Sequence, residues 1–218
     1  MRGALHRVRV WDWPTRAIHW LLVLLIPFAW WTWKTDHMQW HRIAGYAVLA
    51  LLAFRLFWGL FGSETARFAH FVRGPRGIWR YVAGRTKASV GHNPLGGLSV
   101  IALLALASAQ AGLGLFAVDE DGLESGPFAS VVSFADGQRA EHWHGILFNA
   151  LLALIALHIA AIALYALAGN NLVGPMIGGT RSVPVDVTAP KRGSIIALIA
   201  GLLLAGTMFA GLMHIDGG

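Results

Sequence analysis

Five apolar runs, at about residues 17–33, 40–61, 95–118, 142–168 and 194–213, most constrain how this chain can fold. Each run is close to the length that a helix needs to cross a hydrocarbon layer of about 30 Å. Only helices and closed barrels satisfy their backbone hydrogen bonds in lipid, and these runs lack the alternation of barrel strands. The composition agrees, since 56% of the 218 residues are hydrophobic and 13% are charged. The sequence therefore predicts an all-α integral membrane protein.

We expect two parts. Residues 1–178 would form a membrane domain whose first four runs make a four-helix transmembrane bundle. Residues 179–218 would form a linker and a fifth, C-terminal transmembrane helix, interpreted as a packing helix or a docking surface for a partner. No small-residue cleavage site follows the first run, so the N-terminus is interpreted as a basic tail rather than a signal peptide.

The loop charges predict the orientation in the membrane. Basic residues dominate the segments 1–16, 62–94 and 169–193, whereas carboxylates dominate the segment 119–141. The positive-inside rule then places the N-terminus and both basic loops in the cytoplasm, and the acidic loop and the C-terminus outside. The net charge of +6 is thus attributed to topology and not to nucleic-acid binding. The basic residues of the first three segments are Arg2, Arg7, Arg9, Arg16, Arg67, Arg73, Arg76, Arg80, Arg85, Lys87, Arg181, Lys191 and Arg192. The acidic residues of the segment 119–141 are Asp119, Glu120, Asp121, Glu124, Asp136 and Glu141.

The chain has ten histidines and no cysteine. This excludes disulfides, thiolate-held iron–sulfur clusters and covalently attached c-type haem, so histidine, carboxylate or methionine must hold any metal or haem. In the fourth run His144 and His158 are fourteen residues apart, which places them on one helix face about 21 Å apart along the axis. His142 would point away from the face of His158, so His144 is preferred.

The other runs offer a partner for each of these histidines. His41 begins the second run at its outer edge and His19 lies at the inner edge of the first run. We therefore expect an outer pair, His41 and His144, and an inner pair, His19 and His158; His37 is the weaker alternative to His41. Two such pairs are what two six-coordinate haems require, with no open iron position for oxygen chemistry. The runs have almost no carboxylates, which argues against a metal transporter.

Two residues of the second run could assist such a group. Gly45 lies one turn below His41, where a missing side chain leaves room for something flat and bulky, although ordinary helix packing also uses glycine. Arg55 shares the face of His41 at inner depth and would suit an anion such as a haem propionate; the alternative is an arginine that snorkels to the membrane edge. The third run is interpreted as scaffold, with Gln110 and Gly112 open to other uses. His70 and His92 are expected in a surface loop and not as ligands.

Several motifs resemble the bacterial cytochrome b-561 / Ni,Fe-hydrogenase b-type cytochrome family. They are VWDWPTR at 10–16 with His19 and Trp20, WHRIAGY at 40–46 with Arg55, Trp58 and Gly59, His144 with Asn149 and His158, FVRGP at 71–75, HNPLG at 92–96 and NLVGPM at 171–176. The resemblance covers about residues 8–178. It implies a four-helix core in the bacterial inner membrane that holds two non-covalent, bis-histidine haems b. His19, His41, His144 and His158 match its ligand positions, and Arg16, Gly45 and Arg55 are further candidates for haem binding. The fifth helix is a departure from the family's core pattern.

We expect a cytochrome that carries electrons between the quinone pool and a periplasmic redox protein, for which a c-type cytochrome is the first candidate. The acidic loop would steer a basic partner, although it could also be a solvated loop that merely obeys the topology rule. One alternative is a superoxide:quinone oxidoreductase, which so acidic an external face disfavours because it repels a small anion. Another is the membrane-anchor cytochrome subunit of a hydrogenase or dehydrogenase. Enzymatic activity and homo-oligomerisation are left open.

Overall fold

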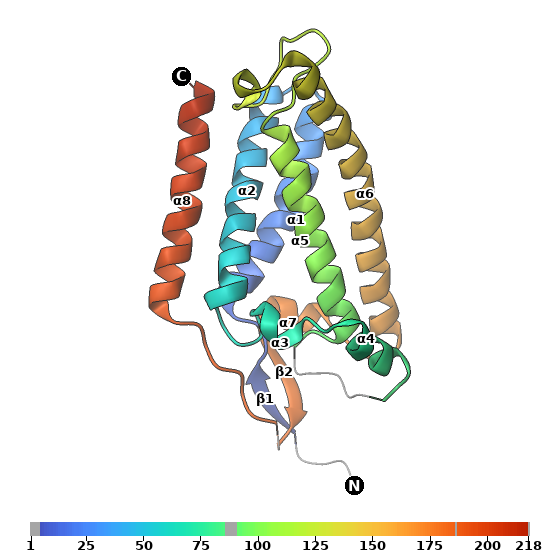
Figure 1. Ribbon diagram of the computed structural model, residues 1–218. Coiled ribbons are helices and arrows are strands. Elements are labelled where there is room, and N and C mark those ends of the chain that lie inside the picture. The colour runs from blue at the N-terminus through green and yellow to red at the C-terminus, as the bar shows by residue number, and fades with distance from the viewer. Residues whose placement is uncertain (1–4, 86–90, 186, 218) are drawn as a thin grey trace. The chain divides into compact units, whose positions relative to one another are not determined.

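The computed structural model describes residues 5–85, 91–185 and 187–217. Within these ranges five helices are long and apolar enough to cross a membrane: α1 (Trp13–Lys34), α2 (Met38–Phe61), α5 (Pro94–Gly114), α6 (Phe134–Leu167) and α8 (Ile195–Gly217) (Figure 1). The predicted all-α membrane fold, with four spanning helices and a fifth at the C-terminus, is confirmed. The largest difference is in α6, which begins at Phe134 rather than near residue 142. Arg2 and Lys87, which entered the orientation argument, lie outside the described residues.

Shorter elements occupy the connecting segments. Helices α3 (Phe68–Phe71) and α4 (Pro75–Val82) lie in the long basic loop, and a 3-10 turn (Ala129–Val131) lies in the acidic loop. Helix α7 (Val173–Gly178) and strand β2 (Thr180–Pro184) follow α6, and strand β1 (Leu5–Arg9) precedes α1.

The chain forms two compact units, and every spanning helix contributes residues to both. Unit 1 consists of Met1–Ile18, Arg55–Ala102 and Leu157–Ala200, and unit 2 of His19–Phe54, Leu103–Ala156 and Gly201–Gly218. The predicted division into a membrane domain, residues 1–178, and a C-terminal segment, residues 179–218, does not correspond to these two units and stays a prediction. Each unit is described by itself.

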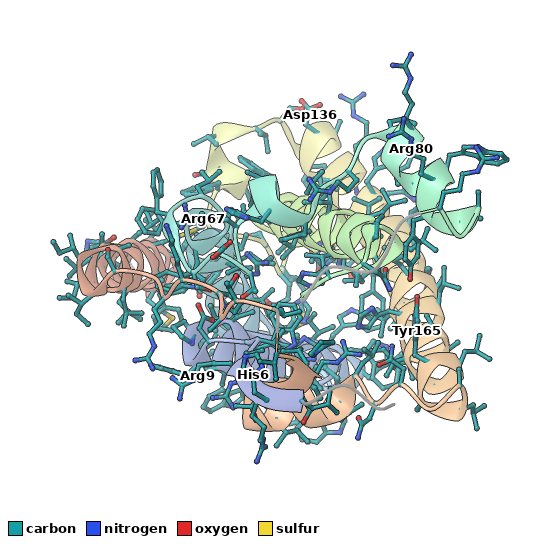
Figure 2. The ribbon with its side chains drawn as sticks, turned by 90° about the horizontal axis from the view of Figure 1, so that it is seen from below. His6, Arg9, Arg67, Arg80, Asp136 and Tyr165 are labelled. Atoms are coloured by element: carbon teal, nitrogen blue, oxygen red, sulfur yellow. The ribbon has the colours of Figure 1, made fainter. Side chains whose placement is uncertain are left out.

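In unit 1 the two strands pair antiparallel, with Leu5 opposite Pro184 and Arg9 opposite Thr180. Val8 and Val183 are buried with Val10 and Trp11, and Met176 of α7 packs against them. Figure 1 shows this ribbon beside α7, and Figure 2 shows Arg9 and His6 on it. The strands thus tie the N-terminal tail to the segment after α7, two stretches that carried no such signal in the sequence.

Asp12 fixes the start of α1 in unit 1. Its carboxylate accepts hydrogen bonds from the backbone N–H of Thr15, at 2.9 Å, and from the indole N–H of Trp58, at 2.8 Å. The first of these bonds is the usual N-cap of a helix, and the second joins the cap to the end of α2. Trp58 is almost completely buried, so this bond is shielded from water.

In unit 2 the fifth spanning helix packs against α2. Leu212 of α8 belongs to one buried cluster with Tyr46 and Leu49 of α2. The guanidinium of Arg42 lies 3.1 Å from the carboxylate of Asp216 in α8 and 2.5 Å from that of Glu124 in the acidic loop. Helix α8 runs to Gly217, past the predicted end near residue 213, and Asp216 lies in this additional turn. Apolar packing and an ion pair therefore attach α8 to α2.

Candidate functional site

The imidazoles of His41 and His144 meet inside unit 2. His41 lies in the first turn of α2 and His144 in the third turn of α6, and their ring centroids are 6.1 Å apart with the planes at 82°. The structure thus brings together the two residues of the expected outer pair. Their role as ligands stays a prediction.

Each of these two rings is held through its Nδ1 atom. Nδ1 of His41 lies 2.8 Å from the backbone oxygen of Ala29 in α1, and Nδ1 of His144 lies 2.8 Å from that of Gln110 in α5. A carbonyl oxygen can only accept, so each Nδ1 carries the proton and donates it. In a neutral imidazole Nε2 is then the unprotonated nitrogen, which is the atom that can bind a metal, and the carbonyls fix the ring orientations.

Helix α5, interpreted from the sequence as scaffold, positions His144. Besides its backbone oxygen, Gln110 places its side-chain amide nitrogen 3.1 Å from Nε2 of His144, where it donates to the unprotonated nitrogen. The side-chain oxygen of Gln110 is buried and has no partner among the described residues. A metal at Nε2 would require this amide to turn away. A Cβ at Gly114 would lie 2.9 Å from Cε1 of His144, so glycine is needed for the close approach of the ring.

The His41–His144 pair fits the haem that the sequence predicts. An ion bonded to two imidazoles at about 2 Å from each nitrogen needs ring centroids roughly 6 Å apart. The observed separation is 6.1 Å. A Cβ at Gly45 would meet no atom within 4 Å, so the expected open space beside α2 is present. Donor atoms, spacing and room all agree with a bis-histidine haem.

The two histidines of the expected inner pair belong to different units, so their pairing stays a prediction. In unit 1 Nδ1 of His158 lies 3.4 Å from the hydroxyl of Ser99 in α5. In unit 2 the ring of His19 contacts that of Trp20 edge-on at 5.1 Å.

Two arginines of unit 1, the buried Arg55 and the half-buried Arg16, have unused hydrogen-bond donors. Arg55 is only 4% exposed, so the snorkelling alternative is wrong; its guanidinium lies over Phe68 at 5.2 Å and donates one long bond of 3.4 Å to the oxygen of Ala66. Arg16 donates to the oxygen of Ile177. Among the described residues, the second terminal nitrogen of Arg55 and Nε of Arg16 are buried without an acceptor. Such donors are costly unless an anion meets them, which fits the carboxylates of a haem.

His92 is half-buried rather than fully exposed, so the expectation of a surface residue holds only in part. Its ring packs between Trp11, at 4.6 Å, and Phe71, at 4.4 Å. Burial lowers the pKa of His92 to about 3, with smaller contributions from the charges of Arg55 and His158. His92 is therefore neutral at physiological pH. His70 is exposed, 3.7 Å from Glu64.

A polar cluster that the sequence did not reveal joins α4 to α6 in unit 1. The hydroxyl of Tyr165, labelled in Figure 2, lies 3.2 Å from that of Tyr81 and accepts a hydrogen bond of 2.8 Å from the amide of Asn93. The bond with Tyr165 raises the pKa of Tyr81 to about 12. Asn93 belongs to the HNPLG motif, and this motif was the sign of the cluster in the sequence.

Comparison with known proteins agrees with the resemblance seen in the sequence. The family model described as prokaryotic cytochrome b561 matches residues 10–179. A "Probable Ni/Fe-hydrogenase B-type cytochrome subunit" of Azotobacter chroococcum mcd 1 is 24% identical over 164 residues, which cover 67% of this chain and 68% of that protein. The protein of the same name from Azotobacter vinelandii is 23% identical over the same shares. No solved structure matches the chain. The chain therefore belongs to the prokaryotic cytochrome b561 family, as a multi-pass membrane b-type cytochrome of electron transfer that carries haem b.

Proposed function

We propose that this cytochrome of the bacterial inner membrane holds two haems b and carries electrons between the quinone pool and a periplasmic redox protein. His41 and His144 would bind the haem nearer the periplasm, and His19 and His158 the haem nearer the cytoplasm. The observation that supports this best is the His41–His144 pair, because both rings present an unprotonated Nε2 at a spacing that suits one iron.

The ligand type determines the chemistry. A bound haem supplies one-electron exchange at its iron. Imidazoles on both faces leave no open position for oxygen, which favours electron transfer over oxygen chemistry. The backbone oxygens of Ala29 and Gln110 hold the two imidazoles in one orientation and select the neutral tautomer whose Nε2 can bind iron.

Unsatisfied arginine donors in unit 1 support the proposal of a second haem. Arg16 and Arg55 offer guanidinium donors to propionates, and His158 belongs to the same unit. A buried positive charge also favours the reduced state, because reduction removes one positive charge from the iron. Arg55 should therefore raise the midpoint potential of the haem nearer the cytoplasm.

The acidic loop supports a basic periplasmic partner. Glu120 and Asp121 are exposed, whereas Glu124 is engaged with Arg42. Exposed carboxylates attract an oppositely charged surface and accelerate encounter. A basic c-type cytochrome has the required charge.

Two-step redox spectroscopy tests the proposal. Decylubiquinol added to the purified protein should reduce two b-type haems per chain, and a basic soluble c-type cytochrome added next should reoxidise them. If quinol reduced neither haem, or if only one haem were present, the proposal would fail.

A second candidate is the membrane cytochrome subunit of a hydrogenase. The names of the two Azotobacter relatives favour it, since both are called probable Ni/Fe-hydrogenase B-type cytochrome subunits. Mild-detergent purification from the native membrane distinguishes the two. Co-elution of a hydrogenase with hydrogen-dependent haem reduction would make this chain an anchor subunit, whereas haem reduction by quinol alone would favour the first proposal.

A further inference from the structure

A groove of about 460 Å³ lies between α1 and α6 in unit 2, where the C-terminal half of α1 runs beside the N-terminal half of α6 (Figure 1). It is lined on one side by Trp30, Trp33 and Lys34 of α1 and on the other by residues of α6 between Glu141 and Leu152. Neither His41 nor His144 is part of the lining, so the groove is distinct from the space between the two rings.

The groove changes character along α6. Glu141 and His142 stand at one end with Lys34, and Phe148 and Leu152 stand at the other, about 17 Å along the helix axis at 1.5 Å per residue. The first end lies near the termini of the two apolar runs, and the second lies deep within them. A ligand that matches this order has a polar head and an apolar tail.

The head must also be flat and able to form hydrogen bonds. Trp30 and Trp33 line the groove and are 43% and 47% exposed, and the ammonium of Lys34 lies over the Trp33 ring at 4.6 Å. Among the described residues, neither His142 nor Asn149 makes a side-chain hydrogen bond, so both are free to bind an oxygen of a ligand. An asparagine at the depth of a lipid-facing apolar run is costly without a partner.

We infer that this groove binds the headgroup of a quinone or quinol, with His142 and Asn149 at its oxygens and its isoprenoid tail along Phe148 and Leu152. The volume of this open groove lies within the range of about 300–1,000 Å³ typical of small-ligand sites. This inference rests on the proposed function and names where its membrane substrate binds.

The position relative to the histidine pair supports the assignment. All groove residues of α6 lie within eight residues of His144, or about 12 Å along the helix axis. A quinone bound there would lie beside the helix that holds the proposed iron ligand of unit 2.

Photo-affinity labelling of the haem-loaded protein in phospholipid nanodiscs tests the inference. An azidoquinone should attach to residues 30–34 or 141–152, as mapped by peptide mass spectrometry, and excess decylubiquinone should displace it. Labelling elsewhere, while decylubiquinol still reduces the haems, would overturn the groove and leave the proposed function standing. Labelling of the groove that decylubiquinone does not displace would identify an acyl-chain groove and would also overturn the inference. If decylubiquinol reduced no haem, the proposed function itself would fail.

Kinetics with matched tryptophan variants give a second measurement. Trp33→Leu should raise the KM for decylubiquinol about tenfold, the factor that corresponds to 1.4 kcal/mol, with little change in kcat. Trp31→Leu is the control, because Trp31 lies on the same helix, is 54% exposed and does not line the groove. Equal KM values for the two variants would contradict the inference.

Discussion

The two regions that we propose as haem sites, the His41–His144 pair in unit 2 and the surroundings of His158 in unit 1, differ in how their side chains are held. In the first, two backbone oxygens fix both rings through Nδ1, and the Gln110 amide occupies Nε2 of His144 at 3.1 Å until an iron displaces it. In the second, Nδ1 of His158 has only a 3.4 Å contact with a hydroxyl, while buried guanidinium nitrogens have no acceptor within the described part of the chain. If both regions bind haem as proposed, ligand orientation would dominate at the first site and anion binding at the second.

Removal of a proposed haem ligand should have the largest effect, the loss of one haem. His144→Ala should lower the haem content from two per chain to one and remove the haem of unit 2, because one axial bond is lost. His158→Ala should remove the other haem. Pyridine haemochrome analysis with reduced-minus-oxidised spectra measures both.

His142→Ala is the control for haem content, since its ring lies on another face of α6. If His142→Ala lost a haem while His144→Ala kept both, the ligand assignment would be wrong.

A methyl group added beside His144 should disturb the orientation of its ring without removing the proposed ligand. Gly114→Ala places a Cβ 2.9 Å from Cε1 of His144, so the ring or α5 must move, at a cost of roughly 1–3 kcal/mol in stability. The variant should lose the haem of unit 2 at a lower denaturant concentration than the parent. Gly112→Ala, whose Cβ would meet no atom within 4 Å, should behave like the parent. Identical haem loss in both variants would remove Gly114 from the account.

Loss of the buried charge of Arg55 should change the midpoint potential of the haem proposed for unit 1 and leave that of the haem of unit 2 unchanged. Arg55→Gln should lower its midpoint potential by roughly 60 mV, a tenfold change in the equilibrium for one electron, because the reduced state loses a nearby positive charge. Arg55→Lys should restore part of the potential, and the exposed Arg76→Gln should leave it unchanged. A potentiometric titration in which both haems shifted equally would erase the proposed contrast.

The ion pair between α2 and α8 should stabilise unit 2 modestly. The Arg42 and Asp216 side chains are 24% and 17% exposed, so their coupling should be about 1 kcal/mol. A double-mutant cycle with Arg42→Gln and Asp216→Asn, followed by chemical unfolding in detergent, measures this coupling. A coupling near zero would leave the apolar contact of Leu212 as the attachment of α8.

The acidic loop should have the smallest effect. Glu120→Gln combined with Asp121→Asn should slow reoxidation by a basic c-type cytochrome two- to threefold at low salt. The difference should vanish at high salt, where screening shortens the range of the charges to a few ångströms. Stopped-flow rates measure it, and a rate unchanged at low salt would exclude these carboxylates from docking.

The spanning helices and the His41–His144 pair could be predicted because both follow from local rules. Lipid thickness sets the length of each run, and helical periodicity sets which histidines share a face. The contacts that position these histidines could not be predicted in the same way. A backbone oxygen, such as that of Ala29 or Gln110, leaves no mark in the residue type that carries it.

The ion pair of Arg42 with Asp216 and the pairing of β1 with β2 were missed for a different reason. Arg42 and Asp216 are 174 residues apart, and Arg7 and Thr180, hydrogen-bonded across the strands, are 173 apart. In both pairs, no periodicity in the sequence around one residue indicates that the other is its partner. Gln110 was visible as a polar residue in an apolar run, but only the fold shows that it faces His144.

Electron paramagnetic resonance of the oxidised His158→Ala variant tests most directly whether His41 and His144 hold a haem. In this variant the haem of unit 2 should be the only one left. We predict one low-spin ferric signal of the highly anisotropic type that near-perpendicular imidazole planes produce, as the angle of 82° between the rings requires. A high-spin ferric signal, or no haem at all, would contradict the account.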